Sequence, residues 1–160
     1  MKFTTLSTIC LAAGITLAAP TTPSSEESTT LQPIFIDSWT AKLLSKVPQG
    51  TMTFNMGDPN NKDVVKTNCT VYWQRGITFP DNKMVKCHNA AYEFGFPKGI
   101  DSIDDFTLKV ARTDGAWSAQ YAANSKNENW NCNEYTQGDF KEKCDLIGTM
   151  NLDVTPPSSS

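Results

Sequence analysis

Residues 105–122, DFTLKVARTDGAWSAQYA, decide the fold class of this 160-residue chain. Every second residue from Phe106 to Val110 is apolar, and the same period of two returns after Asp114-Gly115. This alternation is typical of strands that place one face on a core and the other in water. Asp-Gly favours positive φ angles, so we predict a β-hairpin with a type I′ turn.

The same alternation recurs on both sides of this hairpin. Four further segments place an apolar side chain at every second residue: 51–56, 69–74, 92–96 and 150–154. Clusters of Gly, Pro, Asp and Asn at 57–61 and 80–82 are typical of turns between strands. Residues 41–47 instead suggest one or two helical turns. We therefore expect an all-β fold, a compact antiparallel β-barrel or sandwich.

The start of the chain predicts export from the cell. Lys2 precedes an apolar stretch that is too short to span a bilayer and ends in small residues, which is typical of a signal peptide cut after Ala18. We expect a signal peptide at 1–18, a flexible Ser/Thr/Pro leader at 19–32, a β domain at 33–154 and a disordered tail at 155–160. The mature protein is then secreted and extracellular.

The cysteine count agrees with export. Of five cysteines, Cys10 leaves with the signal peptide and an even number remains. Those four are Cys69, Cys87, Cys132 and Cys144. Four cysteines allow three pairings. We favour Cys69–Cys87 and Cys132–Cys144, because each of these pairs flanks a short segment that can fold back on itself. The chain has no CxxC pair and only one histidine, so we expect no metal site and no cofactor.

Charge and motifs exclude several function classes. The net charge of −3 is spread along the chain without a Lys/Arg run, so nucleic acid and anionic membranes are not expected partners. His88 is the sole imidazole, and no GxSxG motif accompanies it. Acidic turn residues near Asp58, Asp63 and Asp104 lack the spacing of a calcium loop. We therefore predict no catalytic residue, and a small hydrolase that uses carboxylates ranks last.

Candidate binding residues come from the aromatic side chains. Trp73 and Trp117 lie on the apolar faces of their strands and are expected in the core. Trp130 lies among asparagines and is the best candidate for an exposed contact residue, together with Tyr135. Separately, Asn68-Cys69-Thr70 is a sequon for N-glycosylation at Asn68.

The order of these features resembles the fungal secreted family typified by the major allergen of Alternaria. The resemblance covers Ile34 to Val154: two cysteine-containing strands (68–74 and 84–88), an aromatic alternating strand (92–96), the hairpin, a late cysteine pair and a last alternating strand. It implies a compact β-barrel with two intrachain disulfides. It also implies an extracellular protein without an established general enzymatic activity.

The resemblance also implies a role. Several members of that family elicit plant defence or act as virulence-associated effectors, and some are allergens. We therefore expect a non-enzymatic fungal effector or elicitor that binds a host protein or surface receptor. The alternative is a carbohydrate-binding module for cell-wall polysaccharide, with Trp130 and Tyr135 as contacts. The Alternaria allergen has an N-terminal cysteine that joins two chains, and this mature chain has none there, so we expect a monomer or a non-covalent oligomer.

Overall fold

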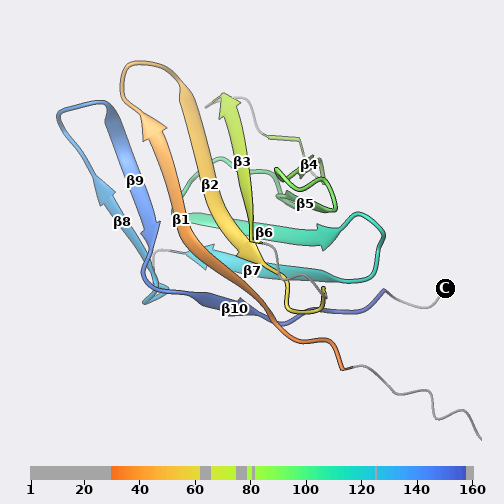
Figure 1. Cartoon of the computed structure of the whole chain (residues 1–160). Coiled ribbons are helices and arrows are strands. Elements are labelled where there is room, and N and C mark those ends of the chain that lie inside the picture. The colour runs from red at the N-terminus through yellow and green to blue at the C-terminus, as the bar shows by residue number, and fades with distance from the viewer. Residues whose placement is uncertain (1–29, 62–65, 75–78, 81, 125, 158–160) are drawn as a thin grey trace, which may run out of the picture.

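The computed structural model describes residues 30–61, 66–74, 79–80, 82–124 and 126–157. Within these residues the chain forms ten strands in two antiparallel sheets and contains no helix (Figure 1). The expected all-β class is therefore confirmed, as two separate sheets. The predicted signal peptide and most of the predicted leader lie outside the described residues. No described helix is long and apolar enough to cross a membrane.

The first sheet is built around β1, and its order is β3-β2-β1-β9-β8, with β10 beside the start of β1. Its strands are β1 (Ile34–Leu44), β2 (Gln49–Gly57), β3 (Thr67–Gln74), β8 (Trp130–Glu134), β9 (Phe140–Leu146) and β10 (Met150–Leu152). The second sheet, in the order β4-β5-β6-β7, contains β4 (Met84–Lys86), β5 (Tyr92–Gly95), β6 (Asp105–Arg112) and β7 (Ser118–Asn124). Because β3 and β8 each have one neighbour in this order, they are the edges of the first sheet.

The core lies between the two sheets and is rich in aromatic rings. In Figure 1, β6 and β7 run across the strands of the first sheet. Trp39 of β1 is 1% exposed, and its ring centroid lies 5.6 Å from Phe54, 5.6 Å from Phe106 and 4.9 Å from Trp130. Tilted and edge-on contacts of this kind favour aromatic pairs beyond the area that they bury. This cluster joins strands from both sheets.

A bulge in β1 explains why the sequence pattern did not predict this strand. Ser38 has a φ of 52°, and the pairing of β1 with β2 shifts register between Asp37 and Thr40. Because of the extra residue, the next buried side chain after Ile36 is that of Trp39, and residue 38 is exposed. The helical turns suggested for 41–47 are therefore wrong: residues 41–44 continue β1.

The hairpin of β6 and β7 is confirmed, but its turn type is not. Val110 pairs with Ala119 in the register of a hairpin. Type I′ needs positive φ at both central residues, whereas in this turn only Gly115 has one, 76°. The Gly115 N–H donates to the Arg112 carbonyl over 3.0 Å, and the Asp114 carboxylate accepts the Ala116 N–H over 3.0 Å. The aspartate thus shapes the loop through its side chain.

Both favoured disulfides are present. Cys69 of β3 is bonded to Cys87, which follows β4, so this bond joins the edges of the two sheets. Cys132 and Cys144 are directly opposite each other on β8 and β9, within the first sheet. The first bond therefore connects the two sheets, whereas the second connects two paired strands of one sheet.

The ordered chain extends slightly past both predicted boundaries. Gln32, assigned to the leader, donates its backbone N–H to the Asn60 side chain over 2.7 Å and accepts the Asn60 amide over 2.8 Å. Thr155, assigned to the disordered tail, exchanges two backbone hydrogen bonds with Ser118 of β7. Residues 158–160 of the predicted tail lie outside the described part of the chain.

Candidate functional site

The free edge of β3 is the first part of the site. Along this strand the backbone groups of alternate residues point toward β2 or away from it. The Asn68 carbonyl accepts the His88 N–H over 2.8 Å, so Asn68 points away from β2. The register between β2 and β3 is continuous, so Thr70, Tyr72 and Gln74 point the same way. No described residue pairs with these three.

A groove opens where this edge meets the connection between β1 and β2. It has a volume of about 420 Å³, and its lining is Val47, Pro48, Gln49, Tyr72, Trp73 and Gln74. Tyr72 is 65% exposed and Val47 is 45% exposed, so large apolar surface remains open to water here. Exposed aromatic side chains of this kind are enriched at protein interfaces.

Trp73 forms the buried wall of the groove. It is 6% exposed and lies opposite Gly50 of β2, on the inner face of the sheet. A Cβ atom at residue 50 would lie 2.2 Å from the indole Cε2 atom, so only glycine lets the ring pack there. The buried Trp73 Nε1–H has no hydrogen-bond acceptor among the described residues. This site therefore combines open backbone groups and exposed apolar side chains with a buried indole as its wall.

Trp130 is not where sequence reasoning placed it. It is 2% exposed, and its Nε1–H donates to the Ile103 carbonyl over 2.9 Å. The expectation of an exposed contact residue is wrong, because the asparagines on either side of Trp130 belong to the other face of β8 and to the turn before it. Tyr135 is 43% exposed in the connection between β8 and β9. The structure therefore does not bring these two residues together on one surface.

Asn68 is exposed on β3, as a sequon residue must be. Its side-chain amide donates to Asn55 Oδ1 over 3.2 Å, and its side-chain Oδ1 accepts the Thr70 hydroxyl over 3.0 Å. The intervening Cys69 is buried and bonded. Glycosylation of Asn68 remains a prediction.

Asp58 is a buried carboxylate held by the fold. It follows β2 and is 1% exposed. Its Oδ1 accepts the Asn60 N–H over 2.8 Å and the Asn60 amide over 3.0 Å. Its Oδ2 accepts the Tyr92 hydroxyl and the Trp117 Nε1–H, each over 3.2 Å. Since protein donors occupy both oxygens, Asp58 acts as a link to the second sheet. Asp63 lies outside the described residues.

This buried environment changes the pKa of the Tyr92 hydroxyl. Burial raises the pKa of its hydroxyl, and the neighbouring Asp58 raises it further. The amide of Asn61, 3.4 Å from the hydroxyl oxygen, acts in the opposite direction. At neutral pH the phenol therefore keeps its proton and donates a hydrogen bond to Asp58.

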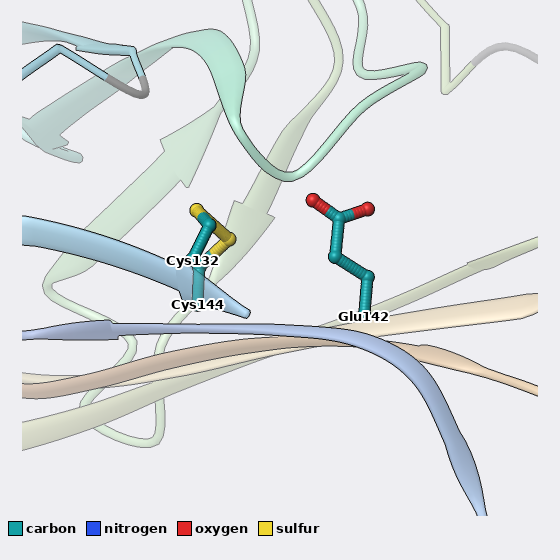
Figure 2. Close-up of side chains that lie close together, drawn as sticks. All are labelled: Cys132, Glu142 and Cys144. Carbon is teal, nitrogen blue, oxygen red and sulfur yellow. A yellow bond between two sulfur atoms is a disulfide. The ribbon is translucent and has the colours of Figure 1, made fainter. Parts of the chain in front are cut away.

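A second group of side chains gathers beside the Cys132–Cys144 disulfide. Figure 2 shows Glu142 next to this bond. Both sulfur atoms are used in the disulfide, so neither is a thiolate that could bind a metal. Burial raises the pKa of Glu142, and the charges of Asp104 and Glu134 raise it further. Glu134 is the direct cross-strand neighbour of Glu142.

Sequence reasoning missed Tyr72, although a signal was present. Within 69–74 the buried positions are Cys69, Val71 and Trp73, so Tyr72 falls on the solvent face. A large aromatic residue on the solvent face of a strand marks a contact surface when it forms a patch with other exposed apolar side chains. Val47 carries no comparable signal, because its exposure depends on how the connection between β1 and β2 folds.

Of the comparisons with known proteins, only the one with solved structures finds similar proteins. No protein-family model matches the chain, and no curated protein is similar to it in sequence. Two crystal structures of Alt a 1, the major allergen of Alternaria alternata, are similar. One is 18% identical, with a TM-score of 0.50, over 81% of this chain and 92% of the allergen. The other is 17% identical, with a TM-score of 0.48, over 80% and 97%.

At these identities the similarity shows a shared fold and nothing about activity. The expected structural resemblance to the Alternaria allergen is therefore confirmed at the level of the fold. The disulfides are consistent with an extracellular protein, because such bonds persist in oxidising compartments.

Proposed function

We propose that this protein is secreted and acts outside the cell as a non-enzymatic effector or elicitor, by binding a plant protein or surface receptor. The observation that carries the proposal is the groove at the free edge of β3, where Tyr72 and Val47 are exposed on a scaffold stapled by two disulfides. Rigid scaffolds with exposed aromatic anchors suit protein recognition, because little conformational freedom is lost on binding.

The fold supports the proposal without deciding it. The chain shares its fold with an allergen of Alternaria, and the sequence features resemble the family that this allergen typifies. A fold by itself does not specify a function, so the groove and not the sheets must carry the activity.

Leaf infiltration tests the proposal. Purified protein with both disulfides intact is expected to trigger an oxidative burst or local cell death. Tyr72→Ala should weaken the response because it removes the exposed anchor of the groove. Ile147→Ala is the matched control: Ile147 is also exposed, at 57%, but it follows β9, with β1 and β2 between it and β3. The absence of a response to the wild type in several plant species would contradict the proposal.

A second proposal, binding of cell-wall polysaccharide, now depends on Tyr135. Burial of Trp130 removes one of the two aromatic contacts, but Tyr135 remains 43% exposed and available to stack on a sugar ring. A pull-down on chitin, cellulose and glucan tests it. Retention of the wild type on one polymer, lost in Tyr135→Ala, would support this second proposal. Equal retention of both proteins would remove Tyr135 as the contact.

A further inference from the structure

The unpaired part of β3 is limited to a short run. At the start of the strand, the His88 N–H covers the Asn68 carbonyl and the Cys69–Cys87 bond holds this segment in place. From Thr70 to Gln74 no described residue covers the edge. Five extended residues span about 17 Å. They offer the N–H and C=O groups of three outward-pointing residues, in the alternating order that another extended strand matches.

This run lacks the usual protection of an exposed edge. Natural edges carry lysine, proline or a bulge that prevents pairing with another chain. Thr70–Gln74 reads Thr-Val-Tyr-Trp-Gln, without a charge or a proline, and the register with β2 has no bulge. The groove lies at the end of the same run. Free backbone groups and exposed apolar surface therefore lie along one edge.

We propose that the Thr70–Gln74 edge docks an extended peptide segment of a partner protein, which adds to the first sheet as a further strand. The segment pairs with the outward N–H and C=O groups of Thr70, Tyr72 and Gln74. It places an apolar side chain in the groove against Val47 and Tyr72. This proposal rests on the proposed function and names the kind of partner that the binding site accepts. Strand addition of this type derives its affinity from main-chain hydrogen bonds and its specificity from side-chain pockets.

A peptide segment fits this edge better than a second copy of the chain. At one end of the open run the His88 N–H occupies the Asn68 carbonyl, and at the other end Val47 and Pro48 line the groove beside Gln74. A single extended strand enters between these flanks. A second folded domain would have to clear both of them to pair over the same three residues.

A proline substitution provides a selective test. Proline is tolerated on an edge strand when its missing N–H faces away from the sheet. Tyr72→Pro therefore removes an outward donor and obstructs strand addition but leaves the hydrogen bonds between β2 and β3 intact. Tyr72→Thr is the matched control, because it changes the same side chain and keeps the N–H.

The probe is a displayed library of random linear peptides, selected on the full-length protein with both disulfides formed. We expect selected peptides to bind Tyr72→Pro about ten-fold or more weakly than Tyr72→Thr, the loss that one or two backbone hydrogen bonds would cause. In the wild type the peptide should slow amide hydrogen exchange at Thr70, Tyr72 and Gln74. If Tyr72→Pro does not fold, this exchange measurement decides alone.

Three results would overturn the proposal: no enriched peptide, equal binding to Tyr72→Pro and Tyr72→Thr, or exchange protection elsewhere on the surface. A concentration-dependent dimer that Tyr72→Pro abolishes, without peptide binding, would also overturn it in favour of a second copy. The leaf assay keeps the two proposals apart. A leaf response that persists undiminished in Tyr72→Pro contradicts both the groove and the edge as the binding site but leaves the effector function standing, whereas peptide binding without any leaf response contradicts only the effector function.

Discussion

At the scale of single residues, Asp58 connects the two sheets. Its carboxylate follows β2 of the first sheet, while its donors Tyr92 and Trp117 belong to the second sheet or its hairpin. An ionised carboxylate is expensive to bury unless hydrogen bonds replace its water. Here four hydrogen bonds satisfy it: two come from Asn60 and two cross the interface. The buried carboxylate therefore has its four donors only in the assembled fold.

Replacement of Asp58 should destabilise the protein strongly. Asp58→Ala leaves the Tyr92 hydroxyl and the Trp117 Nε1–H buried without an acceptor. We expect the free energy of unfolding to fall by roughly 3 kcal/mol, measured by urea denaturation. Tyr92→Phe in the Asp58→Ala background should cost less than Tyr92→Phe alone, since the partner is already lost. A loss below about 0.5 kcal/mol, the scale of ordinary surface substitutions, would contradict this role.

Glu142 should make stability depend on pH. Its pKa is raised in the folded state, first by burial and then by Asp104 and Glu134. The folded state therefore favours the protonated acid, and this contribution to stability is lost as the pH rises through the folded pKa. Glu142→Gln removes the like-charge pair with Glu134 and should stabilise the protein at neutral pH by about 0.5 kcal/mol.

The gain from Glu142→Gln should vanish in acid, below the ordinary glutamate range of about pH 4. Urea denaturation of both proteins across this range measures the difference. Glu128→Gln is the matched control, because Glu128 is an exposed glutamate in a turn. A gain that is independent of pH would show that packing, and not the charge of Glu142, is responsible.

At the scale of elements, strands with unbroken alternation were predictable and those with interruptions were not. β2, β3, β6 and β7 bury every second residue over most of their length, so the period of two in the sequence indicates them directly. β1 escaped prediction because its bulge shifts the buried face by one residue. β8 was not predicted because most of it is exposed. β9 was not predicted because the charged Glu142 interrupts the apolar alternation between Phe140 and Cys144.

The same reasoning explains the outcome at the candidate site. Trp130 was expected to be exposed because its sequence neighbours are polar, but this first residue of β8 is buried against Phe106 and against Ile103, which is 27 residues away in the sequence. Tyr72 was visible as a solvent-face residue. Its importance depends on the sheet order, since only an edge strand has free backbone groups. Sheet order is a property of long-range pairing that local alternation does not encode.

The bulge in β1 makes a prediction about Ser38. A non-glycine residue at a φ of 52° is strained, because its Cβ approaches the following carbonyl oxygen. Ser38→Gly should therefore stabilise the protein by up to about 1 kcal/mol, and Ser38→Val, which is β-branched, should destabilise it by a similar amount. Thermal unfolding of the three proteins measures the order. The prediction fails if valine is tolerated as well as glycine.

At the scale of the whole molecule, three interactions hold the two sheets together in addition to their shared core. The Cys69–Cys87 bond joins one pair of edges, Asp58 bridges the interior, and the pairing of Ser118 with Thr155 ties the end of the chain to β7. The Cys132–Cys144 bond differs, because it lies within the first sheet between strands that already pair. Loss of the cross-sheet bond should therefore affect the relative placement of the sheets, which loss of the other bond leaves unchanged.

Removal of each disulfide in turn distinguishes the effect of the bond between the sheets from that of the bond within the first sheet. The bonds close loops of 18 and 12 residues, for which the chain-entropy model gives nearly the same stabilisation, about 3 kcal/mol each. We expect the double substitution Cys69→Ser/Cys87→Ser to lower the unfolding free energy by more than Cys132→Ser/Cys144→Ser. Only the first also releases the β3 edge from the segment around His88. Urea denaturation gives the two losses, and amide exchange at Asn68 and His88 should speed up only in the first variant. Equal losses with unchanged exchange would mean that the core alone positions the sheets and that the open edge of β3 does not depend on this bond.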